Sequence, residues 1–258
     1  MEYPLIDPVI VRIGPLQLRW YGLMYIVGFA VAYFVILHTT RKKKLPMSRT
    51  DVEDLVTYSI LGLVVGARIG YCLIYHPLYY LSHPAKFLAV WEGGMSFHGG
   101  LVGLLVMGTL FSRLRNKPFL MLADLGALAA TPGLFFGRIG NFINGELFGR
   151  VTEVPWGMVF PGGGPFPRHP SQIYEALGEG LLLFLILSLV AGRTKSHGVV
   201  FGFFLVSYGV VRFFLEFFRE PDPQLGFVVG WLTMGQVLCS LMAAAGIVLV
   251  AWRVKSGG

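Results

Sequence analysis

Charged residues are scarce in this chain of 258 residues. Asp, Glu, Lys and Arg make up only 14% of it, whereas 55% of the residues are hydrophobic and the mean hydropathy is +0.66. An average soluble domain carries roughly a quarter charged residues. This chain therefore lacks the polar side chains needed to cover a water-facing surface. Disorder is excluded as well, because disordered chains are poor in apolar residues. The composition indicates a membrane protein.

Cysteine is almost absent. Cys72 and Cys239 are the only two cysteines, and both lie in apolar runs, which argues against a disulfide framework and against a cysteine metal site. No second histidine stands at a ligand spacing such as His-x-x-x-His, so we also expect no zinc site.

Long hydrophobic runs dominate what is present. Seven of them are close to the roughly 20 residues that a helix needs to cross a bilayer, and none alternates as a barrel strand would. The third run is short, and the fourth carries Asp124 and Pro132. We predict an all-α integral membrane protein, a bundle of seven transmembrane helices that forms a single membrane domain over residues 1–258. The predicted spans are 18–38, 55–75, 95–111, 119–137, 173–191, 198–218 and 231–252.

The positive charges cluster after every second span. Twelve of the 21 basic residues follow the first, third, fifth and seventh runs. The positive-inside rule then places the N-terminus outside and the C-terminus in the cytoplasm, with outer loops over 76–94 and 141–170. The membrane topology therefore accounts for the net charge of +7, and we expect no nucleic-acid partner. The twelve residues are Arg41, Lys42, Lys43, Lys44, Arg49, Arg113, Arg115, Lys117, Arg193, Lys195, Arg253 and Lys255.

Residues 1–17 do not read as a cleaved signal peptide. They contain three prolines and two acidic residues and lack a basic start followed by an apolar stretch. We expect a short arm at the outer interface, and retained spans of this kind imply an inner or plasma membrane.

The other nine basic residues all lie in a predicted span or on the predicted outer side, and eight of them are arginine. An arginine inside a span is costly and tends to mark function. Its planar fork binds phosphate or carboxylate through two parallel hydrogen bonds. This pattern favours an anionic headgroup as ligand, although Arg12, Arg19 and Arg150 can also be explained by snorkelling to the interface. The nine are Arg12, Arg19, Arg68, Lys86, Arg138, Arg150, Arg168, Arg212 and Arg219.

One polar stripe lies inside the sixth span. Tyr208, Arg212 and Glu216 are spaced i, i+4 and i+8 in an otherwise apolar stretch, which places them on one helical face. Such a face must meet the bundle interior or a wet cavity. A buried Arg212–Glu216 ion pair that only fixes helix packing is the alternative.

A second feature is the segment Gly-Arg-Ile-Gly-Asn-Phe-Ile-Asn-Gly-Glu over residues 137–146, with a further glycine at Gly149. Such backbone at the outer end of the fourth span is tolerated where it lines a cavity inside the protein. Glycine permits close approach of a ligand, while Asn141 and Asn144 add neutral donors and acceptors. The segment matches neither a Walker loop nor a dinucleotide fingerprint. A plain loop is the alternative.

A third feature is His98, followed by Gly99 and Gly100, with Gly103 one turn further on. Small residues there allow neighbouring helices to pack closely. His98 is the only histidine in an apolar segment near the predicted outer face, although a single histidine is often structural. Tyr21 lies at the outer end of the first span, where an aromatic belt would also explain it.

Together these segments resemble the prolipoprotein diacylglyceryl transferases of bacteria. The resemblance is carried, in the family's order, by residues 20–24, 66–71, 94–101, 137–149, 168–172 and 208–219. It implies a seven-helix enzyme of the bacterial inner membrane, with its site toward the outer half. The enzyme would move the diacylglyceryl group of phosphatidylglycerol onto the thiol of the lipobox cysteine of a prolipoprotein. The products would be a thioether and glycerol phosphate, and the scheme requires no cofactor and no metal.

The resemblance also implies a role for each candidate residue. Arg138 would bind the phosphate, Arg212 would stabilise the leaving group, and His98 would be the base for the thiol. The expected substrate-binding residues are Arg138, Tyr21, Asn141, Asn144, Glu146, Gly149, Tyr208 and Glu216, of which Glu216 would position Arg212. A transporter or flippase for an anionic lipid is the competing class. It is disfavoured because transport sites lie near the midplane between repeats.

The topology is testable with reporter fusions. We expect a reporter fused near Lys43 to be cytoplasmic and one near Pro161 to be external, because the basic stretches alternate as seven spans require. Enzymatic activity of paired cytoplasmic and periplasmic reporters measures this. A cytoplasmic signal at Pro161 would rule out the seven-span arrangement.

Overall fold

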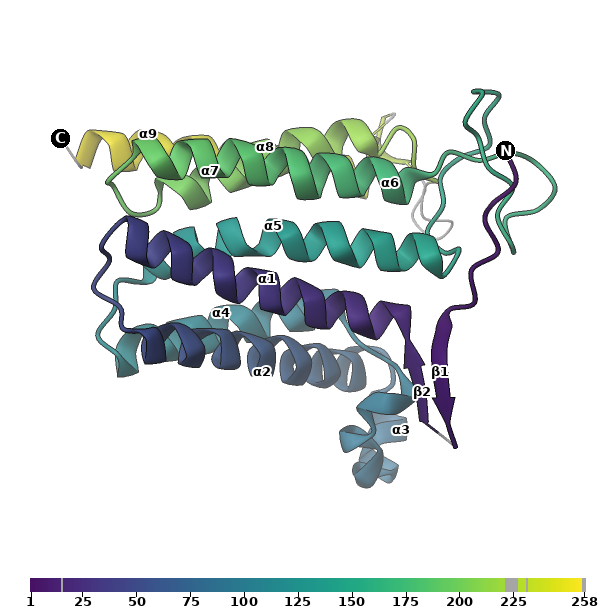
Figure 1. Ribbon diagram of the computed structural model, residues 1–258, viewed down its shortest axis with the longest axis horizontal. Helices are drawn as coiled ribbons and strands as arrows, with labels where there is room; N and C mark the ends of the chain where they lie inside the picture. Colours follow the sequence, from purple (N-terminus) through teal and green to yellow (C-terminus); the bar gives the residue numbers. More distant parts are fainter. Residues whose placement is uncertain (15, 221–226, 231, 257–258) are drawn as a thin grey trace. The chain divides into compact units, whose positions relative to one another are not determined.

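The computed structural model describes residues 1–14, 16–220, 227–230 and 232–256 and is mostly helical (Figure 1). The chain divides into two compact units. One comprises Met1–Ile36 together with Asp124–Gly258, and the other comprises Leu37–Ala123.

The helices have the length and composition that the hydropathy pattern predicts. Among the described residues, six helical stretches are long and apolar enough to cross a membrane. A shorter apolar helix, α8 (Val199–Leu215), has 17 residues. A mostly helical membrane protein is thus confirmed, whereas the seventh crossing and the orientation stay predictions. The six stretches are α1 (Trp20–Lys42), α2 (Arg49–Ile74), α4 (Phe97–Leu114), α5 (Phe119–Ile143), the stretch Ser171–Arg193 and α9 (Met234–Ser256).

Several boundaries differ from the predicted ones. The predicted last span begins at Trp231, which lies outside the described residues, and α9 begins at Met234. Helix α5 continues to Ile143, beyond the predicted end of the fourth span at Gly137 and into the predicted outer loop 141–170. The glycine at 140 serves helix packing here, because a Cβ atom at Gly140 would lie 2.9 Å from the Tyr21 ring of α1.

The stretch Ser171–Arg193 is not a uniform α-helix. It consists of α6 (Ser171–Glu175), a π-helical segment (Ala176–Leu182) and α7 (Leu183–Arg193). π-Helical turns inside α-helices are frequently found at functional sites. Two short antiparallel hairpins complete this unit, β1 (Val9–Ile13) with β2 (Leu16–Arg19), and β3 (Phe227–Val229) with β4 (Leu232–Thr233).

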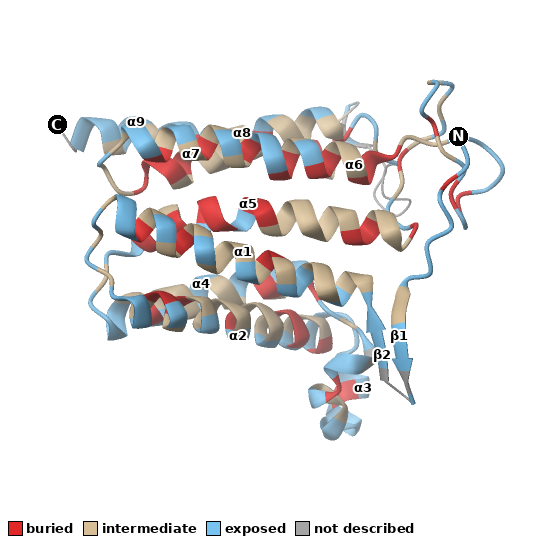
Figure 2. Cartoon of the chain, viewed as in Figure 1, coloured by how far each residue is buried: buried red, intermediate tan, exposed pale blue. Residues whose placement is uncertain are grey.

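The core of this unit lies between α5, α7 and α8. Leu128, Leu187, Ala191 and Val200 are buried against one another, and Figure 2 shows the buried residues along α5, α6 and α7. Helices α8 and α9 also approach closely, since a Cβ atom at Gly209 would lie 2.6 Å from the Cys239 carbonyl oxygen. Close backbone packing of this kind is typical of helices in membranes.

Helices α2 and α4 of the other unit pack through glycine. Gly62, Gly66 and Gly70 share one face of α2, and a Cβ atom at Gly62 would lie 2.6 Å from the carbonyl oxygen of Gly103 on α4. The predicted close packing of the small residues after His98 is confirmed.

Arg68 fixes the segment between α2 and α4, which contains α3 (Pro77–Ser82) and the 3₁₀ turns Pro84–Leu88 and Val90–Glu92. Its guanidinium is buried and donates to the carbonyl oxygens of Phe87 at 3.0 Å, Lys86 at 2.6 Å and Gly94 at 3.1 Å. These contacts give Arg68 a structural role, because its guanidinium holds the irregular segment through the carbonyl groups of that segment.

Glycine 103 offers a test of this packing. We expect Gly103→Ala to lower the free energy of unfolding by about 1–3 kcal/mol, as overpacking does, because the new methyl group would overlap Gly62 O and lie 2.9 Å from Gly66 Cα. Denaturant unfolding in detergent micelles measures the effect. Gly108→Ala on the same helix is the matched control, since its nearest neighbour is 3.9 Å away. Equal stability of the two variants would contradict the close packing.

Candidate functional site

A buried cluster of charges lies inside the unit formed by residues 1–36 and 124–258. Its members come from α5, the α6–π segment, α8 and the turn that follows α8, and every one of them forms an ion pair within the cluster. They are Arg138, Glu175, Glu179, Arg212, Glu216 and Arg219.

Glu175 and Glu179 stand at the centre of this cluster. Glu175 Oε2 lies 2.8 Å from Arg138 Nε, and Glu175 Oε1 lies 3.3 Å from Arg212 Nη1. Glu179 Oε1 lies 3.2 Å from the same Arg212 nitrogen, while its Oε2 lies 3.6 Å from Arg138 Nη2. Arg219 Nη1 adds a contact of 3.5 Å to Glu175. Each carboxylate therefore meets at least two guanidinium groups.

Glu216 holds Arg212 from the other side. Arg212 Nη2 donates to Glu216 Oε2 at 2.9 Å, and Thr233 Oγ1 donates to Glu216 Oε1 at 3.2 Å. The ion pair between Arg212 and Glu216 is thus present, but it is one part of a larger network.

The acids are more deeply buried than the bases. The side chains of Glu175 and Glu179 are 2% and 0% exposed, whereas those of Arg138, Arg212 and Arg219 are 19%, 14% and 28% exposed. Burying a charge is costly unless a partner and hydrogen bonds compensate it. The carboxylates therefore compensate the arginines from the inside, and the remaining N–H groups can meet an anion from the more accessible side.

Glu175 and Glu179 were missing from the candidate residues. The signal was available, because two acids four residues apart lie in an otherwise apolar span and ionisable residues in a span tend to be functional. Among the acids inside the predicted spans, only Glu216 was considered as a candidate, because it lies on the same helical face as Arg212. No pattern in the sequence indicated the π-helical segment that carries Glu179.

A second polar group gathers around Glu146. Asn141 Nδ2 and Asn144 Nδ2 donate to Glu146 Oε1 at 2.9 and 3.1 Å, and Gln172 Nε2 donates to the Glu146 carbonyl oxygen at 2.6 Å. The structure therefore brings these three predicted residues together. Asn144 Oδ1 and Gln172 Oε1 are buried and accept no hydrogen bond from any described residue. Both oxygens could accept a hydrogen bond from a ligand hydroxyl.

Gly149 is explained by packing of the segment after Glu146. Its N–H donates to the His169 carbonyl oxygen at 2.9 Å, and its own carbonyl accepts from Arg168 Nη1 at 3.1 Å. A Cβ atom at Gly149 would lie 2.9 Å from His169 Cβ. Burial lowers the pKa of His169. A headgroup contact of Gly149 stays a prediction.

The two candidate tyrosines lie in the same unit. Tyr208 precedes Arg212 by one turn of α8 and interacts electrostatically with Glu179. Tyr21 packs on Gly140 and interacts with the side chain of Asn141. Tyr21 thus adjoins the Glu146 group, and Tyr208 adjoins the charge cluster.

His98 belongs to the other unit, Leu37–Ala123, as the second residue of α4. Ser96 caps this helix by accepting from the Gly99 N–H at 3.2 Å, and the His98 ring is exposed and meets Phe97 edge to face. The other nine candidate residues share one unit. The role of His98 stays a prediction.

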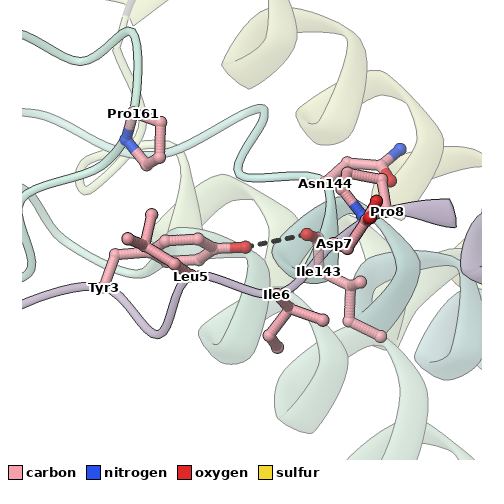
Figure 3. Close-up of a pocket in the computed structure, with 8 residues that line it drawn as sticks. All are labelled: Tyr3, Leu5, Ile6, Asp7, Pro8, Ile143, Asn144 and Pro161. Atoms are coloured by element: carbon pink, nitrogen blue, oxygen red, sulfur yellow. Dashed lines mark hydrogen bonds between the residues drawn. The ribbon is translucent and has the colours of Figure 1, made fainter.

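A cavity of about 360 Å³ borders the Glu146 group (Figure 3). Its walls are mostly apolar, and the Tyr3 hydroxyl lies 2.8 Å from the Ile143 carbonyl oxygen at the end of α5. The cavity is lined by Tyr3, Leu5, Ile6, Asp7, Pro8, Ile143, Asn144 and Pro161.

Over residues 1–14, 16–220, 227–230 and 232–256, no three His, Cys, Asp or Glu side chains are placed to hold a metal ion.

The chain is similar to known proteins over nearly its whole length. Residues 8–252 match the family model described as prolipoprotein diacylglyceryl transferase. A phosphatidylglycerol–prolipoprotein diacylglyceryl transferase from Geobacter sulfurreducens is 53% identical, with 96% of each chain covered. The proteins of that name from Nitratidesulfovibrio vulgaris (strain DP4) and Coxiella burnetii are 52% and 50% identical. They cover 100% and 99% of this chain, which in turn covers 97% and 98% of theirs.

Proposed function

The chain belongs to the prolipoprotein diacylglyceryl transferase family, and we propose that it transfers the diacylglyceryl group of phosphatidylglycerol to the lipobox cysteine of prolipoproteins. The reaction forms a thioether, releases glycerol phosphate and is the first step of bacterial lipoprotein maturation. Relatives that are 50–53% identical to this chain over nearly its full length are named for this reaction, which supports the proposal. The arginine–glutamate cluster is the structural observation that carries it.

The chemistry explains why arginine is needed. A cysteine thiolate attacks the glyceryl carbon, the bond from this carbon to the phosphate oxygen breaks, and its electron pair stays on the phosphate. The leaving glycerol phosphate therefore gains negative charge, which groups placed in advance can stabilise. Arg138 and Arg212 are held by buried carboxylates at 2.8–3.3 Å. We assign the phosphate to these two guanidinium groups.

The Glu146 group fits the polar end of the lipid. A glycerol headgroup carries hydroxyl groups that need acceptors, and Asn144 Oδ1 and Gln172 Oε1 are buried acceptors without a described donor. Asn141, Asn144 and Glu146 bind this glycerol in our proposal, and Tyr21 contributes a contact. Tyr208 and Gly149 complete the substrate-binding set, and Glu216 positions Arg212 through its 2.9 Å hydrogen bond.

The membrane arrangement is inferred from the length of α8 and from the distribution of basic residues. We count α8 as the seventh span, because its 17 residues lie at the lower limit of about 17–25 residues for a spanning helix. Arg212 then lies near the outer end of α8, and the acceptor prolipoprotein meets the lipid at the outer half of the bacterial inner membrane. The alternation of basic residues supports this orientation.

Arginine-to-lysine variants test the phosphate assignment. We expect Arg138→Lys or Arg212→Lys to lower turnover roughly ten- to a hundredfold, because lysine keeps the charge but loses the planar fork. One lost charge-assisted hydrogen bond of ~1.5–3 kcal/mol corresponds to this loss. The assay is glycerol phosphate release by purified protein given phosphatidylglycerol and a lipobox peptide.

Arg193→Lys is the matched control, because Arg193 is exposed at the end of α7 and lies outside the cluster. Full activity with lysine at both 138 and 212 would contradict the assignment. Absence of glycerol phosphate release by the unmodified protein would contradict the proposed function itself. Protein levels are compared in parallel, because the cluster also stabilises the helices.

The role of His98 as the base can be tested by pH. A thiolate is the nucleophile, and an unperturbed cysteine is mostly protonated at neutral pH. We expect His98→Gln to lower turnover far more than lipid binding, because glutamine keeps hydrogen bonding but takes up no proton. Higher pH should partly restore the rate, since more thiolate then forms unaided. A variant equally impaired from neutral to alkaline pH would instead make His98 a positioning residue.

A further inference from the structure

We propose that binding of the phosphatidylglycerol headgroup is coupled to the uptake of one proton by the Glu175–Glu179 pair. The inference rests on the proposed function, since it needs a phosphodiester at Arg138 and Arg212. It concerns two residues to which the transfer reaction assigns no part. In this account Glu179 is a positioning residue, because its protonation releases arginine N–H groups for the phosphate.

The pair is a shared and deeply buried acid site. Both carboxylates contact a single nitrogen, Arg212 Nη1, at 3.3 and 3.2 Å, and their side chains are 2% and 0% exposed. Two carboxylates that share a site resist ionising together. Here Arg138 and Arg212 contact both carboxylates, and Arg219 contacts Glu175.

The surroundings of the pair define its charge balance. Arg138 faces it from α5, Arg212 and Tyr208 face it from α8, and Arg219 faces it from the turn after α8. Glu216 lies behind Arg212, and Cys239 of α9 is a further electrostatic neighbour of Glu179. Three guanidinium groups therefore balance three carboxylates. Tyr208 and Cys239 add no charge in their protonated forms.

A bound phosphodiester upsets this balance. It brings one more negative charge into a site with little access to water, and an uncompensated buried charge is costly. Protonation of one carboxylate restores neutrality. It also weakens the ion pairs of that carboxylate with the two arginines, so the guanidinium groups can turn their N–H groups to the phosphate.

Glu179 is the member that takes the proton. Its contacts to Arg138 Nη2 and Arg212 Nη1, at 3.6 and 3.2 Å, involve the groups assigned to the phosphate. Glu175 retains the shorter contact of 2.8 Å to Arg138 Nε and a contact to Arg219. Glu216 retains the hydroxyl hydrogen bond from Thr233. Only Glu179 depends entirely on the N–H groups that the phosphate needs.

Calorimetric titration measures the coupling directly. The full chain in detergent micelles is titrated with short-chain phosphatidylglycerol at one pH, in buffers that differ in ionisation enthalpy. We expect the buffer dependence to report about one proton taken up per bound lipid. When the titration is repeated over a pH series, Kd should rise about tenfold per pH unit above the pH at which the pair loses its proton. Glu179→Gln should abolish both effects. Glu153→Gln, an exposed carboxyl in the segment after α5, is the matched control and should change neither.

The outcomes separate this inference from the proposed function. Glycerol phosphate release with a lipobox peptide is measured on the same preparation. Release without proton uptake on lipid binding overturns the inference and leaves the function standing, whereas absence of release overturns the function. Proton uptake that persists in Glu179→Gln also overturns the inference. If the Glu179→Gln protein does not accumulate, Glu175→Gln is used in its place, and we expect it to lose the proton uptake and the pH dependence of Kd as well. The buffer series on the unmodified protein then decides whether binding and proton uptake are coupled.

Discussion

The compensation of half-buried arginines by buried glutamates is the interaction on which this structure depends. Arg138, Arg212 and Arg219 come from three different segments, and Glu175 contacts all three. Helix α5 can approach the π-helical segment because position 180 is glycine, where a Cβ atom would lie 2.6 Å from Phe135 Cβ. Removing one partner of a buried ion pair costs about 3–5 kcal/mol. The cluster therefore holds these helices in register as well as forming the site.

In the proposed function, this arrangement prepares the protein for a phosphate. The acids are almost fully buried while the guanidinium groups remain partly exposed, so the arginines are oriented before the lipid arrives. Preorganised charge of this kind stabilises the leaving group without reorganisation during the reaction. The adjoining Glu146 group adds neutral donors and acceptors suited to a glycerol. Charge recognition and headgroup recognition thus use separate residues in one unit.

Much of this could be predicted from the sequence, because a membrane restricts where polar side chains occur. Arg212, Tyr208 and Glu216 were identified by helical spacing in an apolar run, and the structure places Arg212 and Glu216 in contact. The role of Arg68 was not predictable, since it depends on carbonyl groups supplied by an irregular segment. The end of α5 was missed because glycine, which weakens a helix in isolation, is here required by the Tyr21 contact. The Glu175–Glu179 pair was missed because neither acid shares a helical face with an arginine of its own span, as Glu216 does.

The central claim is that the phosphate of the lipid lies against Arg138 and Arg212. Solid-state NMR dipolar coupling between ¹⁵N-labelled arginine and the ³¹P nucleus of bound phosphatidylglycerol measures this most directly. We predict strong coupling from the side-chain nitrogens of two arginines, with one signal lost in Arg138→Lys and the other lost in Arg212→Lys. Unchanged coupling in both variants would contradict the account and would place the phosphate at other arginines.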